Sequence, residues 1–148
     1  PMQTFTKGHQ ADFRDIPVFL EGTDAVLEVT RPLAEILSGK VQVLTSEQRL
    51  RLHLGAVFAS NFLNFMLLLS EESVGPLAGL DLKVYEPLVR ECIEKAFRYG
   101  PKAAHTGPAR RGDMVTMQKH LDLIEENSGD SRVAELYRML SGMIGERF

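Results

Sequence analysis

Apolar residues recur along most of this chain at helical spacing, but two short apolar runs near its beginning have a different pattern. Residues 16–20 and 41–45 are brief, apolar and bounded by turn residues, which is typical of strands. Between them, residues 26–37 are apolar at every third or fourth position, and Pro32 inside this pattern predicts a kink. The order strand, helix, strand predicts a βαβ unit with two parallel strands.

One long helical pattern follows, from residue 46 to about residue 73. Thr45 and Gln48 have capping-box spacing, and the pattern contains no proline. It is apolar on nearly every side from Leu54 to Leu69, so we expect a long buried helix, covered by the later helices and by a second copy of the chain. The apolar stretch is shorter than the ~20 residues that a bilayer needs and contains polar residues, so we expect no membrane span.

Three shorter helices are predicted after the turn near residue 76. They cover residues 82–99, with a kink at Pro87, 114–126, with Asp113 as N-cap, and 131–142, with Ser131 as N-cap. The inward positions of the first are predicted to be Leu82, Tyr85, Leu88, Val89, Cys92, Ile93, Ala96 and Phe97. The expected fold is therefore mainly α, with a small βαβ unit in front.

That small sheet is incomplete by itself. Two short strands do not form a stable sheet in water, and parallel strands are normally buried on both faces. We therefore expect additional strands, either from a partner copy or from a part of the sheet that this chain lacks.

Composition and charge narrow the possible function classes. The chain has 148 residues with 17 basic and 20 acidic side chains, and a net charge of −3 excludes a generally basic nucleic-acid binder. The single cysteine, Cys92, excludes an internal disulfide and a Cys-based zinc site, and it fits a reducing cytoplasm. No secretory signal pattern occurs at the start, so we expect a cytoplasmic location.

A stripe of polar residues on the long helix is the first candidate for chemistry. His53, Ser60, Asn61 and Asn64 fall close to one side of a regular α-helix. Buried amide or imidazole groups need hydrogen-bond partners, because an unpaired one costs about 1–3 kcal/mol. Those partners are either neighbouring groups of the fold or a bound substrate.

The loop TGPARRGD, residues 106–113, is the second candidate. Adjacent Arg110 and Arg111, with Thr106 nearby, can hold a carboxylate or phosphate. The alternative is a solvated loop in which Asp113 only caps the next helix. His9, His105 and His120 show no metal-ligand spacing, so we expect no metal site. The sequence contains no glycine-rich dinucleotide motif.

Three segments carry a resemblance to a known family: PMQTF (residues 1–5), HLGAVFASNF (53–62) and TGPARRGD (106–113). In this order they resemble uncharacterised Rossmann-like NAD(P)-dependent oxidoreductases with a C-terminal domain of unknown function. That domain is similar to the helical C-terminal domain of 6-phosphogluconate dehydrogenase, and to those of pyrroline-carboxylate, ketopantoate and β-hydroxyacid reductases. The resemblance implies that residues 1–45 are the last part of a Rossmann domain whose front lies before Pro1. It also implies that residues 46–148 form a helical domain for substrate binding and dimerisation.

The resemblance also implies site residues. In the β-hydroxyacid reductases, a lysine and, one turn later, an asparagine on the long helix serve catalysis. The asparagine position is similar to Asn61, whereas the lysine position falls on Val57, which cannot donate a proton. His53 is the nearby titratable group on that face, and imidazole titrates near neutrality.

We therefore expect this chain to supply the substrate pocket and dimer contact of an enzyme that reduces a C=O or C=N bond. His53 and Asn61 are the predicted catalytic residues, and Ser60, Asn64, Thr106, Arg110 and Arg111 the predicted substrate-binding residues. NAD or NADP is expected in the full-length protein but not on this chain alone. The alternatives are a non-catalytic dimerisation or ligand-sensing module and a plain helical scaffold.

Overall fold

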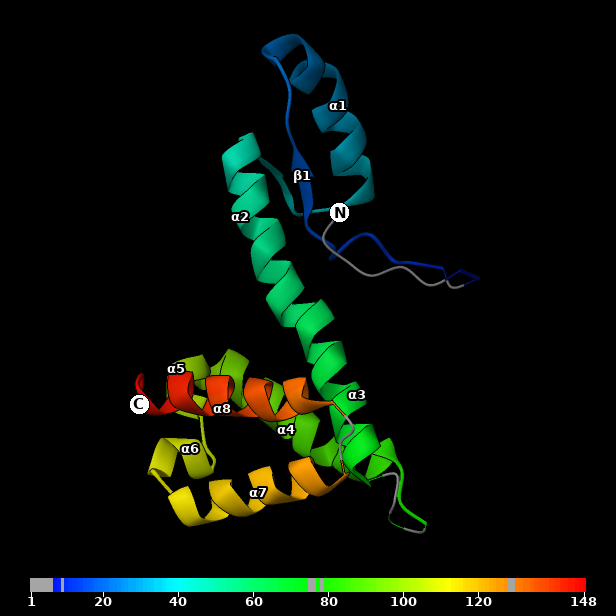
Figure 1. Ribbon diagram of the computed structural model, residues 1–148. Coiled ribbons are helices and arrows are strands. Elements are labelled where there is room, and N and C mark those ends of the chain that lie inside the picture. The colour runs from blue at the N-terminus through cyan, green and yellow to red at the C-terminus, as the bar shows by residue number, and fades with distance from the viewer. Residues whose placement is uncertain (1–6, 9, 75–76, 78, 128–129) are drawn as a thin grey trace. The chain divides into compact units, whose positions relative to one another are not determined.

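The computed structural model describes residues 7–8, 10–74, 77, 79–127 and 130–148, and it is mainly helical (Figure 1). Its contacts divide the chain into two compact units, Pro1–Asp81 and Leu82–Phe148. The long helix therefore belongs to the same compact unit as the strands. The domain boundary after residue 45, which the resemblance implies, stays a prediction.

The first unit begins with the predicted βαβ arrangement. Strand β1 (Val18–Leu20), helix α1 (Asp24–Leu37) and strand β2 (Val41–Val43) follow one another, and β1 pairs with β2 in parallel. The strands are shorter than predicted, by two residues at the start of the first and at the end of the second. Helix α1 runs through Pro32 without ending there.

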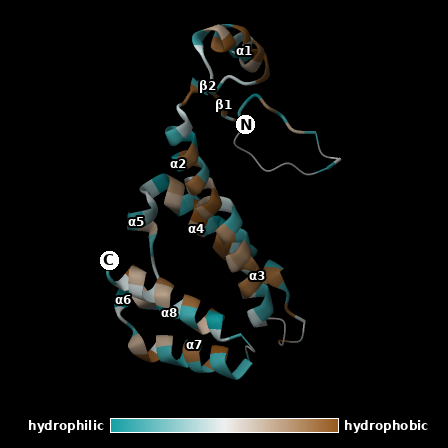
Figure 2. Ribbon diagram, turned by 45° about the horizontal axis from the view of Figure 1, so that its top comes forward, coloured by the Kyte–Doolittle hydropathy of each residue, from teal (hydrophilic) through white to brown (hydrophobic). Residues whose placement is uncertain are grey.

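The apolar face of α1 is wider than its two strands cover. Ala34 is buried, and Leu27 beside it is half-buried. The apolar residues further round the helix are exposed: Leu33 and Leu37, next to the buried side, at 59% and 54%, and Ile36, on the opposite side, at 79% (Figure 2 shows the hydropathy of α1). Because an amphipathic helix buries its whole apolar face in a stable domain, the βαβ unit lacks part of its packing surface. The incompleteness inferred from two short strands is thus also visible on the helix between them.

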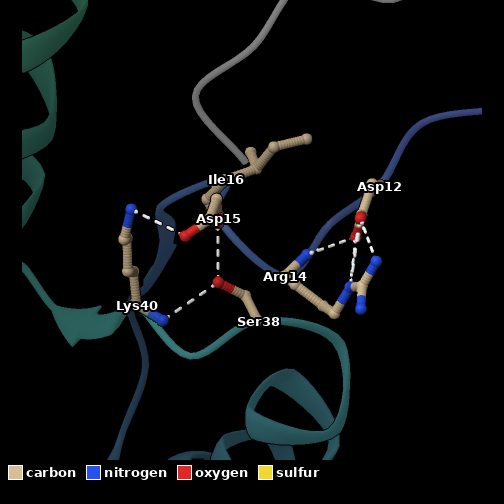
Figure 3. Close-up of polar contacts among 6 residues, drawn as sticks. All are labelled: Asp12, Arg14, Asp15, Ile16, Ser38 and Lys40. Carbon is tan, nitrogen blue, oxygen red and sulfur yellow. Dashed lines mark hydrogen bonds and ion pairs between the residues drawn. The ribbon is translucent and has the colours of Figure 1, made fainter.

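A buried serine closes this unit (Figure 3). Ser38 is 2% exposed, its hydroxyl donates to the Ile16 carbonyl at 2.6 Å, and it accepts from the Lys40 backbone N–H at 3.0 Å. The backbone N–H of Gly39 donates to the Arg14 carbonyl. Ser38 therefore joins the end of α1 to the segments that lead into both strands.

The long helix has three parts: α2 (Ser46–Ala56), a π-helical segment η1 (Val57–Phe62) and α3 (Leu63–Val74). The capping box predicted at its start is confirmed. Thr45 Oγ1 accepts from the backbone N–H of Gln48, and Gln48 Oε1 accepts from the backbone N–H of Thr45. Glu21, which follows β1, pairs with Arg49 at 2.5 Å and accepts from Ser46. These bonds tie the end of β1 to the first turn of α2.

The expectation that this helix is buried is wrong for the single chain. No residue of α2 or η1 is buried, and Leu54, Phe58 and Phe62 are 57%, 62% and 49% exposed. Within the described residues, Ser46–Ser73 is long and apolar enough to cross a membrane by length and composition. Its exposed apolar surface needs a cover that its own compact unit does not provide.

The second unit begins with a short 3-10 turn, η2 (Leu82–Tyr85), followed by α4 (Glu86–Tyr99) and the one-turn helix α5 (Pro101–Ala104). Pro87 lies in the first turn of α4, where proline is favourable, so the predicted kink is instead a helix start. The predicted inward face is also partly wrong. Cys92 is exposed, and Phe97 and Leu88 are 90% and 66% exposed.

Three helices complete this unit: α6 (Pro108–Arg111), α7 (Met114–Asn127) and α8 (Ser131–Gly145), which is three residues longer than predicted. Helices α7 and α8 form a hairpin joined by a His120–Tyr137 hydrogen bond of 2.8 Å and an Arg138–Glu125 ion pair. The predicted cap of α8 is wrong by one residue, because Asp130 rather than Ser131 accepts from the Arg132 N–H.

The Asp130 cap should make α8 sensitive to acid. The side-chain hydrogen bond from Arg132, together with its backbone N–H, lowers the pKa of Asp130 from 3.8 to about 2. Because the folded pKa is depressed, the stabilisation is complete above the unfolded value and is lost as the pH falls toward 2. We expect the Asp130 carboxyl to titrate near pH 2 by NMR in the folded protein. A midpoint near 3.8 would contradict this, and Asp130→Asn should remove the dependence.

Candidate functional site

Three of the predicted polar residues lie together on the long helix. Ser60 and Asn61 in η1 and Asn64 in α3 line an open depression of about 490 Å³. Its other lining residues are Ala59, Leu63 and Leu67. The depression therefore combines two amides and a hydroxyl with small and apolar side chains.

The polar groups of this depression are available to a ligand. Within the described part of the chain, no hydrogen bond joins the side chains of Ser60, Asn61 or Asn64 to another residue. By contrast, Ser70 and Ser73 further along α3 donate to the carbonyls of Met66 and Leu69. Each asparagine amide offers two donors and a two-lone-pair acceptor. The sequence left open whether other residues of the fold would hydrogen-bond to these side chains. None of the described residues does so.

The π segment changes which residues share a face. His53 and Asn64 are eleven residues apart, close to three α-helical turns, so a regular helix would align them. A π turn bonds i to i+5 and adds one residue, which rotates the preceding helix by about 100° relative to the following one. His53 is exposed on α2, before this segment, and does not line the depression.

The arginine loop lies in the other unit and has a defined shape. Gly107 and Gly112 flank α6 with φ of 109° and 65°, conformations that favour glycine. Asp113 accepts from the backbone N–H of Thr116 at 3.0 Å and from its hydroxyl at 2.8 Å, and these bonds lower the pKa of its carboxyl. The capping role predicted for Asp113 is therefore confirmed.

The two arginines of this loop differ in their surroundings. Arg110 donates to the His105 carbonyl, and its guanidinium lies 5.6 Å from the centre of the Phe148 ring. The same Phe148 ring stacks on the imidazole of His105, with centroids 4.6 Å apart and planes 6° apart. Arg110 is thus held by an aromatic contact and a carbonyl, while Arg111 and Thr106 are exposed on the loop.

The turn between the two elements that open the βαβ unit lacks the glycines of a dinucleotide-binding turn. The turn between β1 and α1 contains a single glycine, Gly22, and a Cβ there would lie 2.9 Å from Cγ1 of Val26. Gly22 therefore leaves room for the Val26 side chain of the helix that follows it, rather than for a pyrophosphate. In the described part, no group of three or more His, Cys, Asp or Glu side chains is arranged to hold a metal.

The family follows from comparison with known proteins. Residues 16–144 match the model of a domain of unknown function, DUF2520. The chain belongs to the DUF2520 family. The match includes the βαβ unit, the long helix with its π segment and the arginine loop. All seven predicted site residues therefore lie inside the DUF2520 region.

Two solved structures are similar to this DUF2520 chain. A putative NADP oxidoreductase, BF3122 from Bacteroides fragilis, is 38% identical with a TM-score of 0.89, and the match covers 99% of this chain and 55% of that one. Protein TM1727 from Thermotoga maritima is 29% identical with a TM-score of 0.67, and the match covers 87% and 51%. No curated protein matches. The chain spans about half the length of both solved relatives and has an NAD(P)-oxidoreductase-like fold.

The π segment is the part of the candidate site that the sequence did not predict. Ser60 and Asn61 interrupt the apolar helix at this point, but their side chains make no hydrogen bond to the described backbone, so these residue types do not predict a π turn. The contacts of Arg110 with His105 and Phe148 were also missed, because Phe148 is distant in the sequence and the bond to the nearby His105 carbonyl depends on how the backbone between them folds. The segment 1–5, on which part of the resemblance rests, and His9 lie outside the described residues.

Proposed function

We propose that this chain forms the substrate-facing region of an NADP- or NAD-dependent oxidoreductase that reduces a C=O or C=N bond. The observation that carries the proposal is the 38% identity, over 99% of the chain, with a putative NADP oxidoreductase. The unpaired amides in the depression support it, because a reductase must orient a polar substrate beside its cofactor. The finer kinship, to reductases with a 6-phosphogluconate-dehydrogenase-like C-terminal domain, is part of this proposal.

In this proposal Asn61 donates a hydrogen bond to the oxygen or nitrogen of the reacting double bond. Ser60 and Asn64 orient the substrate beside it. Thr106 with Arg110 or Arg111, in the other compact unit, is proposed as a separate site for an anionic group. His53 supplies or holds a proton, because histidine is the side chain that most often serves as a general acid or base. The rotation introduced by the π segment makes His53 the least supported member of this set.

The cofactor would be bound by residues outside this sequence. Both solved relatives are about twice as long as their matched regions, and the described residues here lack a dinucleotide cradle. We propose that residues 1–45 complete a Rossmann sheet, which would cover the exposed face of α1. Residues 46–148 would then form the helical substrate domain of a cytoplasmic protein.

The test uses the full-length protein. We expect NADPH binding and NADPH oxidation with a carbonyl or imine substrate from a panel of small compounds. His53→Ala should abolish turnover without loss of helicity if His53 acts as acid or base. Lys119→Ala, at an exposed residue of α7, is the control and should retain turnover. Unchanged turnover in His53→Ala would remove His53 from the mechanism.

A non-catalytic dimerisation or ligand-sensing role is the alternative, and one observation favours dimerisation. The exposed apolar residues of the long helix, Leu50, Leu54, Phe58, Phe62, Phe65 and Leu68, are 45–69% exposed. We propose that a second copy covers them. Sedimentation of the full-length protein should show a dimer, and a monomer at all concentrations would contradict this. A dimer that neither binds nor oxidises NADPH would favour the alternative.

A further inference from the structure

The depression on the long helix has no charged lining. Its six lining residues are Ala59, Ser60, Asn61, Leu63, Asn64 and Leu67. None of these side chains is ionisable, so the depression offers no cation to an anionic ligand group and no anion to a cationic one. The cationic side chains predicted to bind substrate, Arg110 and Arg111, belong to the other compact unit.

The hydrogen-bonding capacity of the depression is balanced between donors and acceptors. Asn64 offers an NH₂ group and a carbonyl oxygen, and the Ser60 hydroxyl both donates and accepts. A ligand carboxylate accepts only, so it would leave the Asn64 carbonyl oxygen without a donor once the ligand covers it. A carboxamide or a hydroxyl group fills both roles. Asn64 is exposed in the free chain, where water satisfies its amide, so a ligand that displaces this water must supply both a donor and an acceptor to keep the amide paired.

The apolar side chains of the depression determine which kind of group can lie next to the polar group of the ligand. Leu63 and Leu67 lie one helical turn apart on α3 and therefore share a face with each other. Ala59, in η1, precedes Leu63 by four residues. A short aliphatic stem can pack on these side chains while its polar end reaches Ser60 and Asn64.

We propose that this depression binds an uncharged carboxamide or hydroxyl group on a short aliphatic stem, and thereby selects neutral rather than carboxylate substrates. That the bound molecule is a substrate rests on the proposed function. Asn64 and Ser60 are its specificity-determining residues, and Asn61 is left to the reacting double bond.

The experiment compares two isosteric probes on the full-length protein. Binding of propionamide and of propionate is measured by ligand-observed NMR, with and without NADPH. We expect propionamide to bind roughly tenfold more tightly, which corresponds to about one well-made hydrogen bond. Asn64→Leu removes both the donor and the acceptor at similar side-chain volume and adds no charge, so it should abolish this preference. Ser60→Ala should weaken propionamide binding and leave the helix intact.

The control is Asn127→Leu, because Asn127 is exposed on α7, outside the depression. It should leave both affinities unchanged. Equal or tighter binding of propionate, or a propionamide preference that survives both Asn64→Leu and Ser60→Ala, overturns the inference.

Turnover separates this inference from the proposed function. The protein is also assayed for NADPH-dependent reduction of 2-oxobutanamide and 2-oxobutanoate. If propionamide binds through Asn64 but neither compound nor any panel substrate is reduced, the binding inference holds and the oxidoreductase proposal fails. If 2-oxobutanoate is reduced in preference to its amide, the oxidoreductase proposal holds and the neutral-substrate inference fails.

Discussion

Replacement of Asn61 by alanine in the full-length protein should lower kcat/KM by roughly 10²–10³-fold, the effect of removing one oxyanion-hole donor. Asn61 lies in the π segment, lines the depression and has no hydrogen bond to another described residue, so its amide is free to reach the substrate. A donor aimed at the reacting atom gains strength as negative charge develops there. The loss should therefore appear mainly in kcat rather than in KM.

Two further variants make this prediction specific to Asn61. Asn64→Ala should act mainly on KM, because Asn64 is proposed to orient the substrate rather than to contact the reacting atom. Asn127→Ala, at an exposed asparagine of α7, should have the activity of the unaltered protein. If Asn61→Ala keeps full kcat while its circular dichroism is unchanged, Asn61 has no catalytic role.

Replacement of Ser38 by alanine should destabilise the βαβ unit by about 1–3 kcal/mol, the cost of leaving a buried polar group unpaired. The variant removes the 2.6 Å bond to the Ile16 carbonyl and the 3.0 Å bond from the Lys40 N–H, at a residue that is 2% exposed. Amide hydrogen exchange of Ser38 and Lys40 should therefore be roughly tenfold to a hundredfold faster.

Ser73→Ala is the matched control for this change. Ser73 is exposed and its hydroxyl bonds only to the Leu69 carbonyl one turn back in its own helix, so the substitution should be nearly neutral. Unaltered amide exchange rates at positions 38 and 40 of the Ser38→Ala protein would show that these bonds do not stabilise the unit.

Local chemistry was the most predictable part of the structure. The parallel βαβ order, the capping box of Thr45 and Gln48 and the Asp113 cap follow from residue types at short fixed spacing. Where two adjacent residues can both act as N-cap, the sequence pattern does not show which of them caps the helix. Asp130 displaces Ser131 because its carboxylate also pairs with Arg132 at 2.6 Å.

Burial was the least predictable part, because periodicity identifies which face needs a cover but not which surface supplies it. Leu54 and Phe58 are apolar at buried-looking positions and yet exposed in the single chain. Cys92 and Phe97 were predicted to face inward for the same reason and are exposed. The candidate site was predictable in its residues Ser60, Asn61 and Asn64, but not in its backbone.

The π segment gives this helix a property that a regular helix of the same composition would lack. A one-residue insertion is how a π turn enters an α-helical ladder, so deleting a single codon within Val57–Phe62 can return the ladder to regular α geometry. Such a deletion would turn α2 by about 100° against α3 while keeping nearly every side chain. Related sequences that differ in length by one residue here would thus present a different set of side chains beside Asn64, a simple evolutionary route to new specificity.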